Sequence, residues 1–248
     1  MLWPTPKADV DPAPLYAEAD RGPIGERPWV LVNMISSVDG SAAGPDGRSG
    51  SLGGVADRQV FAAIRAVADV VLAGATTVRQ EGYGPAQVSP ELQAQRIARG
   101  QAPRPRIAVV SASLRLDPSL RLFHDEDALR PLVVTAASAD PEARRRLEPV
   151  ADIVLAGEQT LDWAMALAAL RTVTGANVAV VEGGPMVNGQ LFARDLVDEL
   201  CLTVAPALAG GPAGRIAQAT EPATLRPLTL AHVLTDEGHL LLRYVVRR

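Results

Sequence analysis

Short apolar runs alternate along the chain with segments of helical periodicity. Residues 29–35 form a nearly continuous apolar run, which predicts a strand that is buried on both faces. Over residues 55–68, apolar side chains recur at three- and four-residue spacing, the pattern of a helix with one buried face. The same reasoning predicts strands over 70–73, 106–110, 132–134, 153–155 and 177–181, and helices over 141–150, 161–173 and 185–194.

The C-terminal part of the chain has a different pattern. Strands are predicted over 200–204, 228–234 and 240–246, with a hairpin turn at Asp236-Glu237-Gly238. Alternating strands and helices predict a mostly parallel central sheet with helices on both faces, and the hairpin adds antiparallel edge strands. We therefore expect one α/β domain over residues 29–248, preceded by an extended arm over residues 1–28. Residues 84–105 are expected to form a long connection, and no composition shift around them resembles a linker.

Composition supports a globular chain with a full core. Hydrophobic residues make up 48% of the 248 residues, charged residues 21%, and the net charge is −4. This balance offers no positive field for nucleic acid or for anionic lipid. The first residues lack an apolar signal core, and no apolar stretch reaches the ~18 residues of a membrane span. We expect a cytoplasmic protein with neither nucleic-acid nor membrane partners.

Two residue counts exclude several classes of enzyme. Lys7 is the only lysine, so the chain lacks the lysine of a P-loop and the Schiff-base lysine of pyridoxal-phosphate enzymes. Cys201 is the only cysteine, which excludes disulfides and thiolate zinc sites. The 3 histidines show no metal-ligand spacing, and no Gly-x-Ser-x-Gly motif occurs. We expect no metal.

Three turns that follow predicted strands carry candidate chemistry. Gly74-Ala75-Thr76-Thr77-Val78 and Glu182-Gly183-Gly184-Pro185 each lead from a strand into a helix, where free N–H groups suit phosphate. Either turn alone is also explained by ordinary helix capping. Together they indicate a ligand with more than one phosphate, such as a dinucleotide, although no Gly-x-Gly-x-x-Gly fingerprint occurs. Ser36-Ser37-Val38-Asp39-Gly40 is either a simple turn or a site that places Asp39 beside that ligand.

These motifs, in this order and together with Leu196-Val197-Asp198-Glu199-Leu200, resemble the reductase domain of riboflavin biosynthesis. That domain is the pyrimidine reductase half of the bifunctional deaminase-reductase. The resemblance runs from about Trp29 to the C-terminus. It implies a dihydrofolate-reductase-like fold, NADPH as cofactor and a homodimer. We expect no deaminase activity, because the sequence has neither His-x-Glu nor Pro-Cys-x-x-Cys.

The resemblance also implies roles for individual residues. Ser111 and Ser113 are candidates for the adenosine 2′-phosphate, with Arg115 nearby, although loop solvation explains these serines equally well. The full set of expected cofactor residues is Asn33, Gly74, Thr76, Thr77, Val78, Ser111, Ser113, Glu182, Gly183, Gly184 and Pro185.

The segment after the first glycine turn departs from the family pattern. Pyrimidine reductases usually carry an acid and an arginine here that hold the ribityl phosphate of the substrate. In this chain Glu81 is the candidate for the acid, and Arg79 or Arg48 is the candidate for the arginine. Ser37 and Tyr83 complete the expected substrate residues.

Asp57 suggests a further substrate contact. It occupies the first turn of the helix predicted over 55–68, comparable to the carboxylate that binds the pterin ring in dihydrofolate reductases. A favourable acid in a helical first turn explains it equally well.

We therefore expect an NADPH-dependent reductase that transfers hydride to a pyrimidine- or pterin-like substrate. Asp39, Asp57 and Glu81 are the catalytic candidates, expected to orient the substrate and its proton supply. Two alternatives stay open: an activity like that of dihydrofolate reductase, and a non-catalytic dimer that binds NADP(H).

Overall fold

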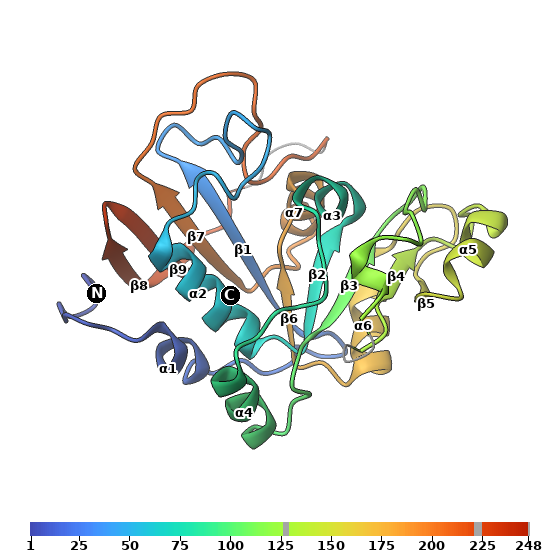
Figure 1. Cartoon of the computed structure of the whole chain (residues 1–248), viewed down its shortest axis with the longest axis horizontal. Coiled ribbons are helices and arrows are strands. Elements are labelled where there is room, and N and C mark those ends of the chain that lie inside the picture. The colour runs from blue at the N-terminus through green and yellow to red at the C-terminus, as the bar shows by residue number, and fades with distance from the viewer. Residues whose placement is uncertain (126–128, 221–224, 248) are drawn as a thin grey trace. The chain divides into compact units, whose positions relative to one another are not determined.

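Strands and helices follow each other in nearly the order that the hydrophobic pattern predicts (Figure 1). The computed structural model describes residues 1–125, 129–220 and 225–247. Two compact units are present. Unit 1 comprises Met1–Ala19, Val30–Ile64 and Val181–Arg248, and unit 2 comprises Asp20–Trp29 and Arg65–Val180. The single domain expected over residues 29–248 stays a prediction.

Unit 2 is built on parallel strands. β2 (Val70–Gly74), β3 (Arg106–Val110), β4 (Leu132–Thr135) and β5 (Asp152–Leu155) pair in parallel in the order β5-β4-β3-β2, and β6 (Val178–Val181) lies next to β2. Every residue of β2, β4 and β6 is buried, as expected for strands covered on both faces. α3 (Ala75–Glu81) packs against β2 and β3, while α5 (Pro141–Leu147) and α6 (Trp163–Thr174) pack against β5.

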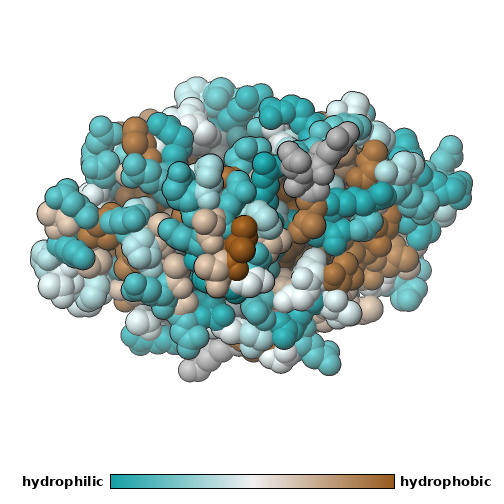
Figure 2. All heavy atoms as spheres, turned by 60° about the horizontal axis from the view of Figure 1, so that its bottom comes forward, coloured by the Kyte–Doolittle hydropathy of each residue, from teal (hydrophilic) through white to brown (hydrophobic). Residues whose placement is uncertain are grey.

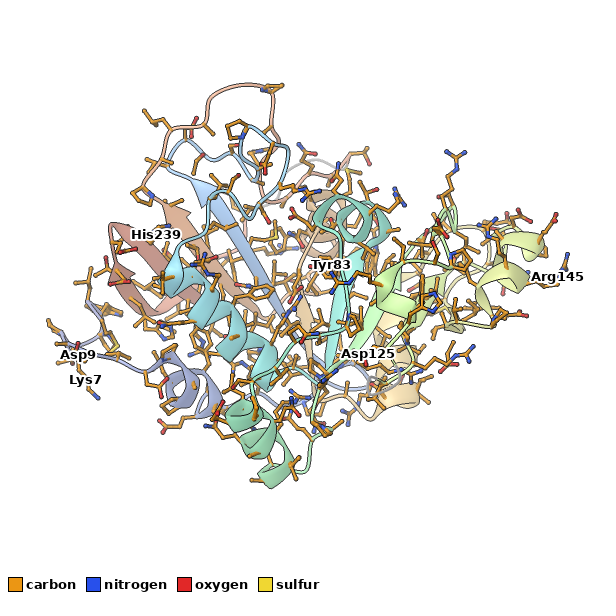
Figure 3. All side chains as sticks on the ribbon, in the orientation of Figure 1. Lys7, Asp9, Tyr83, Asp125, Arg145 and His239 are labelled. Carbon is orange, nitrogen blue, oxygen red and sulfur yellow. The ribbon has the colours of Figure 1, made fainter. Side chains whose placement is uncertain are left out.

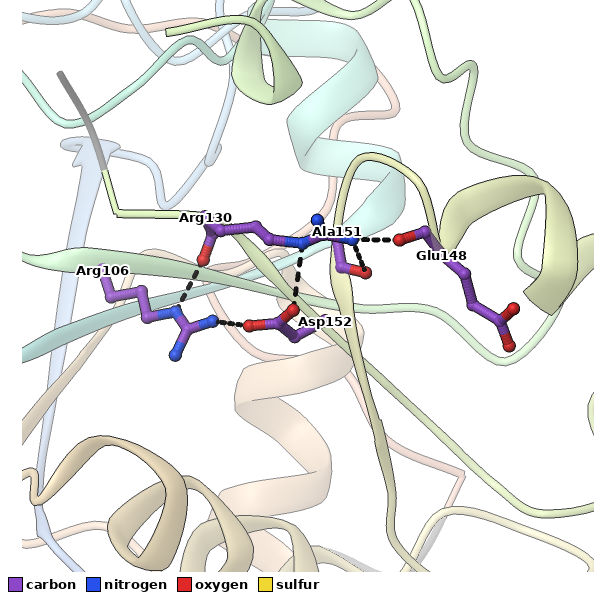
Figure 4. A network of polar contacts seen from close by, with 5 residues as sticks. All are labelled: Arg106, Arg130, Glu148, Ala151 and Asp152. Carbon is purple, nitrogen blue, oxygen red and sulfur yellow. Dashed lines mark hydrogen bonds and ion pairs between the residues drawn. The ribbon is translucent and has the colours of Figure 1, made fainter. Parts of the chain in front are cut away.

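A polar network joins the amino ends of three strands in unit 2 (Figure 4). Asp152, the first residue of β5, forms ion pairs with Arg106 and Arg130, the latter with 2.9 Å between Nε and Oδ1. Arg106 Nε also donates to the Arg130 carbonyl at 2.6 Å, and Arg130 donates to the carbonyls of Glu148 and Ala151. Because these contacts gather at the amino ends, they leave the carboxyl ends to the turns with candidate chemistry.

One helix of unit 2 lies within the long connection expected over residues 84–105. This helix is α4 (Pro90–Ala98), and no helix was predicted in that segment. Ser89 accepts a hydrogen bond from the Leu92 N–H and caps the helix, and Pro90 occupies its first turn. Arg96 is 1% exposed and donates to the carbonyls of Ala66, Ala68 and Ala102. This arginine binds the helix to the rest of the unit, a role that hydrophobic periodicity does not reveal.

Unit 1 combines a parallel pair with antiparallel strands. β1 (Trp29–Ser37), whose first residue belongs to unit 2, runs parallel to β7 (Glu199–Ala205). β9 (His239–Val246) is antiparallel both to β7 and to β8 (Leu228–Asp236). α2 (Val55–Val67) begins in this unit, and α7 (Pro185–Ala193) lies within it. The strands confirm the expected α/β class, mostly parallel with antiparallel strands at the C-terminus.

The N-terminal segment is not extended throughout. α1 (Pro12–Ala17) forms within the arm expected over residues 1–28, so its extended conformation was predicted wrongly. The Asp11 carboxylate accepts a hydrogen bond from the Ala13 N–H, and Tyr16 is fully buried. A capped helix start and one buried aromatic ring stabilise a helix that is too short to show periodicity.

Two further findings concern the described residues as a whole. None of their helices combines the length and the apolar character needed to cross a bilayer. Nor do they contain a group of 3 or more His, Cys, Asp or Glu side chains placed to hold a metal ion. On the face drawn in Figure 2, hydrophilic atoms predominate and hydrophobic side chains are scattered among them.

Candidate functional site

The Ser37–Gly40 turn of unit 1 follows the carboxyl end of β1. Ser37 is 1% exposed, and its hydroxyl donates to Asp39 Oδ1 at 2.5 Å. The two carboxylate oxygens of Asp39 also accept the N–H groups of Ala209 and Gly210, at 3.0 and 2.8 Å. The hydrogen bond from Ser37, together with those from Ala209 and Gly210, lowers the pKa of Asp39 from 3.8 to about 2. A carboxylate that is this acidic stays ionised near neutral pH and does not suit the role of proton donor.

Asp57 and Arg48 carry unused polar groups in the loop and helix that follow. Asp57 Oδ2 lies 2.8 Å from the position that a Cβ would take on Gly53. Within the described ranges, the Asp57 carboxylate and the Arg48 guanidinium have no hydrogen-bond partner. Leu52 helps to hold this loop: its side chain packs with Ile35 and Ala205, and its carbonyl lies 3.2 Å from Nε2 of His239, which Figure 3 labels. Asp57 and Arg48 are therefore both available to a ligand.

The second glycine turn leads from β6 into α7. Gly183 has a φ of +82°, and a Cβ there would lie 3.2 Å from Met34 Sδ. Gly184 is the N-cap of α7 without a side-chain cap, and Pro185 occupies the first turn. Glu182 is buried, and a carboxylate cannot donate to phosphate, so the backbone N–H groups around Gly184 are the donors that suit an anion. The positive φ of Gly183 and the close approach of Met34 both favour glycine at this position.

In unit 2, the first glycine turn and the Ser111–Ser113 turn lie beside each other. Gly74 ends β2 and pairs in register with Val110, the last residue of β3. Arg79 joins the two turns: it donates to Thr76 Oγ1 at 3.2 Å and to the Arg115 carbonyl at 2.8 Å. Parallel pairing of β2 and β3 therefore brings Thr76 and Ser111 to the same sheet edge, as predicted.

The side chains in these two turns of unit 2 differ in exposure. Thr76, Ser113 and Arg115 are exposed and Thr77 is half-buried, whereas Val78 and Ser111 are buried. The Ser111 N–H donates to the Val134 carbonyl and continues the pairing of β3 with β4. Ser113 is thus better placed for a ligand than Ser111.

Glu81 and Tyr83 follow at the far end of α3. The Arg65 guanidinium lies over the Tyr83 ring, 5.8 Å from its centroid, and both Glu81 and Tyr83 are half-buried (Figure 3). α3 has 7 residues and so separates Glu81 from Gly74 by about 10 Å along its axis. The structure thus places Glu81 and Tyr83 together, away from the first glycine turn.

Comparison with known proteins identifies the family. Residues 28–242 match the family of RibD C-terminal domains. The chain belongs to that family. This confirms the resemblance inferred from the motifs, and it places Ser37, Asp39 and both glycine turns inside the matched region.

Individual proteins that resemble the chain were also found. The chain is 29% identical over 185 residues to 2,5-diamino-6-ribosylamino-4(3H)-pyrimidinone 5′-phosphate reductase of Archaeoglobus fulgidus, covering 75% of this chain and 83% of the relative. A pyrimidine reductase-like protein of Corynebacterium diphtheriae is 28% identical with a TM-score of 0.83, covering 96% of this chain and 100% of that structure. A riboflavin biosynthesis reductase of Saccharomyces cerevisiae, 17% identical, shares the fold with a TM-score of 0.67 over 94% of this chain and 95% of that structure.

The Asp198-Glu199 part of the family motif is structural in this chain. The Asp198 carboxylate accepts the Val30 N–H at 2.8 Å and so joins β1 to the start of β7. Glu199 is fully buried, and its Oε1 accepts a hydrogen bond from Arg243 Nε at 2.6 Å. Cys201 Sγ lies 3.8 Å from that same oxygen atom. Asp198 and Glu199 therefore form hydrogen bonds between neighbouring strands, Asp198 with β1 and Glu199 with β9.

Tyr16 and His232 extend this arrangement. Tyr16 OH lies 3.3 Å from His232 Nε2, and the two rings meet edge to face. Burial, with the nearby Cys201 and Glu199, raises the pKa of Tyr16 well above its ordinary value. We call these residues the sheet cluster: Tyr16, Glu199, Cys201 and His232, which are buried, and Arg243, whose side chain is 13% exposed.

Two residues beside the second glycine turn were missed by sequence reasoning. Met34 and Asn188 approach Gly183 most closely, and Asn188 is fully buried. Residues alternate in direction along β1, so Asn33, which was expected at the cofactor, points to the opposite face from Met34. The lack of a side chain at Gly183 was the available signal that another residue packs there.

Proposed function

We propose that this protein is an NADPH-dependent reductase that acts on a ribosylaminopyrimidine phosphate. The observation that carries the proposal is the Gly183–Gly184 turn at the uncapped start of α7. Membership of the RibD C-terminal family supports it, as does the relative named as a pyrimidinone 5′-phosphate reductase. Location in the cytoplasm stays a prediction of the sequence.

The second glycine turn fits the pyrophosphate of NADPH. Because Gly184 offers no side-chain cap and Pro185 has no N–H, the amides of the following residues have no competing acceptor from the cap. A phosphate oxygen would complete that helix end and gain from its dipole. The 3.2 Å distance from Met34 to a Cβ on Gly183 explains why a larger residue would disturb the turn.

In unit 2, Ser113 and Arg115 fit the adenosine 2′-phosphate. Both side chains are exposed, and in the part of the chain that the structure describes neither the Ser113 hydroxyl nor the Arg115 guanidinium has a hydrogen-bond partner. The Arg79 guanidinium donates a hydrogen bond to the Arg115 carbonyl at 2.8 Å. This contact holds the backbone from which the Arg115 side chain extends. Arginine is suited to phosphate because its N–H donors form charge-assisted hydrogen bonds.

Arg48 is the better of the two candidates for the substrate phosphate. Arg79 already donates to Thr76 and to the Arg115 carbonyl. Arg48 is exposed, and its guanidinium has no hydrogen-bond partner among the described residues, although it lies near enough to Asp46 to favour the ionised form of that carboxylate. Asp57 likewise has no hydrogen-bond partner among the described residues. It is the candidate residue for binding the pyrimidine ring, because a carboxylate accepts hydrogen bonds from amino groups.

The chemistry divides between cofactor and protein. NADPH supplies the hydride when bound. Asp57 would orient the pyrimidine ring, and Arg48 would hold the substrate phosphate. Ser37 would lie at the start of the loop that carries Arg48, between β1 and α2. Asp39, with a pKa of about 2, holds loops in place and does not deliver the proton. Glu81, in unit 2, stays a catalytic candidate of the sequence.

Steady-state oxidation of NADPH tests the function. The pyrimidinone ribosylamino phosphate and dihydrofolate are offered separately to the same folded sample, with NADPH binding measured by titration. We expect turnover with the pyrimidine substrate. Turnover with dihydrofolate alone would favour the alternative reductase activity, and binding without any turnover would favour the non-catalytic reading.

Replacing Arg115→Ala tests the assignment of the 2′-phosphate. Affinity for NADPH should fall about 10-fold, in line with the loss of one charge-assisted hydrogen bond, while affinity for NADH should not change. Arg145→Ala removes the same charge from α5 and serves as the control (Figure 3). An equal loss for both cofactors would contradict the assignment.

We also propose that the protein is a homodimer. Three cross-strand pairs of β7 and β9, namely Leu200–Tyr244, Leu202–Leu242 and Val204–Leu240, consist of half-buried or exposed apolar residues on one face. Apolar residues gathered on one partly exposed sheet face support an interface between two copies of the chain. Sedimentation should give a dimer mass for the wild type and a monomer mass for Leu202→Glu.

A further inference from the structure

Residues 207–218 form a segment that follows β7, and we call this segment the brace. It contacts two other parts of unit 1, the Ser37–Gly40 turn and the start of α7. In Figure 1 this orange segment runs beside the light-blue loop that follows β1. The brace is rich in glycine and alanine, and Leu208 in it is 82% exposed. A segment with so little side-chain packing is held in place mainly by its hydrogen bonds.

The first end of the brace is fixed to the Ser37–Gly40 turn. The Val38 N–H donates to the Ala207 carbonyl at 3.0 Å. Asp39 accepts the N–H groups of Ala209 and Gly210 on different carboxylate oxygens. Because both oxygens are used, an amide in place of this carboxylate loses one of the two contacts.

The other end of the brace is fixed to the start of α7. The Gln218 N–H donates to the Pro185 carbonyl at 2.9 Å, and Asn188 Nδ2 donates to the Ile216 carbonyl at 2.7 Å. A Cβ on Gly189 would lie 1.9 Å from the Gln218 carbonyl oxygen, so the brace passes directly over the helix. Between the two ends, the Ala42 N–H donates to the Gly214 carbonyl at 2.9 Å.

Asn188 is not explained by helix stability. It is fully buried, and its Oδ1 has no hydrogen-bond partner within residues 1–125, 129–220 and 225–247. A buried acceptor without a partner destabilises a fold, so its presence indicates another role. The amide nitrogen of the same side chain holds the brace and lies 3.8 Å from the position of a Cβ on Gly183.

We infer that the brace couples the Ser37–Gly40 turn to the second glycine turn, and that Asp39 and Asn188 are positioning residues that act through it. The purpose of this coupling rests on the proposed function: it fixes the loop that receives the substrate and the helix start that receives the cofactor in one geometry. Neither side chain needs to touch a ligand for this role.

A double-mutant cycle on NADPH affinity tests the coupling. Asp39→Asn and Asn188→Ala should each raise the Kd for NADPH about 3- to 10-fold. The double variant should raise it no further than the larger single effect, because either change alone releases the same segment. A double effect equal to the product of the two would overturn the inference. Asn188→Leu, which refills the buried space, replaces Asn188→Ala if that variant does not fold.

Hydrogen exchange without cofactor gives a second readout. In Asp39→Asn, amide exchange should accelerate at Gln218, at the far end of the brace, as well as at Ala209 and Gly210. Acceleration confined to residues 207–210 would mean that the two ends move independently and would overturn the coupling. If the wild type shows coupled exchange but does not bind NADPH, the proposed function fails while the brace stands.

Two control variants match the test variants. In Asp140→Asn the carboxylate uses one oxygen to cap α5, which asparagine does equally well. Thr135→Val removes the other buried oxygen without a partner among the described residues. Neither should change the Kd. In the test variants the KM for NADPH should rise while kcat changes less than about 2-fold. A fall in kcat of about 100-fold or more at unchanged KM would make Asp39 a catalytic residue and overturn its positioning role.

Discussion

Unit 1 contains two sets of polar contacts: those within the sheet cluster and those that hold the brace. The first set joins side chains to each other, and the second joins side chains to the backbone of a loop. In the sheet cluster, side chains on neighbouring strands bind each other, as Glu199 binds Arg243 at 2.6 Å. In the brace, Asp39 and Asn188 bind backbone groups of a loop with few packed side chains. Strand register already fixes the partners of the first network, whereas the second network itself determines where its loop lies.

This difference predicts different costs. A buried ion pair between strands is expensive to break, because the remaining charge stays buried without its partner. A surface loop that loses one hydrogen bond can find water instead, so the fold loses little. Changes in the sheet cluster should therefore appear as lost stability, and changes around the brace as lost affinity.

The largest effect is expected in the sheet cluster. Glu199→Ala should lower the free energy of unfolding by about 3–5 kcal/mol, since Arg243 would keep a buried charge without its carboxylate. Chemical denaturation measures this loss. Changing both partners, Glu199→Leu with Arg243→Leu, should recover most of the stability. A loss below about 1 kcal/mol for the single variant would contradict the contrast with the brace.

Gly183→Ala should produce the largest loss of affinity. Its φ of +82° is strained for alanine, and a Cβ 3.2 Å from Met34 Sδ requires Met34 or the turn to shift. We expect the Kd for NADPH to rise by about 10-fold or more, measured by titration. Gly175→Ala is the matched control: its φ is +70°, and no atom lies within 4 Å of the new Cβ. The control should lose stability through backbone strain alone and keep its affinity.

Arg48→Ala should affect the substrate and spare the cofactor. Loss of a charge-assisted hydrogen bond to the substrate phosphate should raise the KM for the pyrimidine substrate about 10-fold. The Kd for NADPH and the melting temperature should not change, because Arg48 is exposed. Initial rates at varied substrate concentration give the KM, with Arg145→Ala as the charge control. An unchanged KM would return the phosphate to Arg79.

The smallest expected effect is a pH dependence that comes from Asp39. Its pKa falls from 3.8 to about 2 on folding, so the folded state binds protons less readily than the unfolded state. The stability from this group is fully present above pH 3.8 and is lost as the pH falls toward 2. Unfolding curves of Asp39→Asn should show a smaller loss over that window than the wild type. Parallel curves for the two proteins would mean that Asp39 does not contribute.

Periodic segments of the fold were predictable because their burial repeats in the sequence. β1, β3 and α2 form within two residues of the predicted positions. α1 and α4 were not predicted, since their short helices are stabilised by single buried side chains, Tyr16 and Arg96. Such contacts depend on residues far away in the chain and leave no local period.

The candidate site was predictable only in part, for a related reason. Turns at strand ends point to one sheet edge, so Thr76 and Ser113 could be inferred from order alone. The contacts of Asp39 with Ala209 and Gly210 span 170 and 171 residues and have no signature in the chain. The glycine at position 183 could indicate that some other residue packs closely there. It could not show that the neighbours are Met34 and Asn188.

Because Cys201 is buried, a cysteine introduced into the brace can be labelled selectively with a spectroscopic probe. Cys201, the only cysteine of the 248 residues, is 2% exposed, whereas Leu208 is 82% exposed. Reagents that modify accessible thiols should therefore leave the wild type unlabelled and attach a single probe to Leu208→Cys. A spin label at that position would report nanosecond mobility of the segment directly, before and after ligand is added.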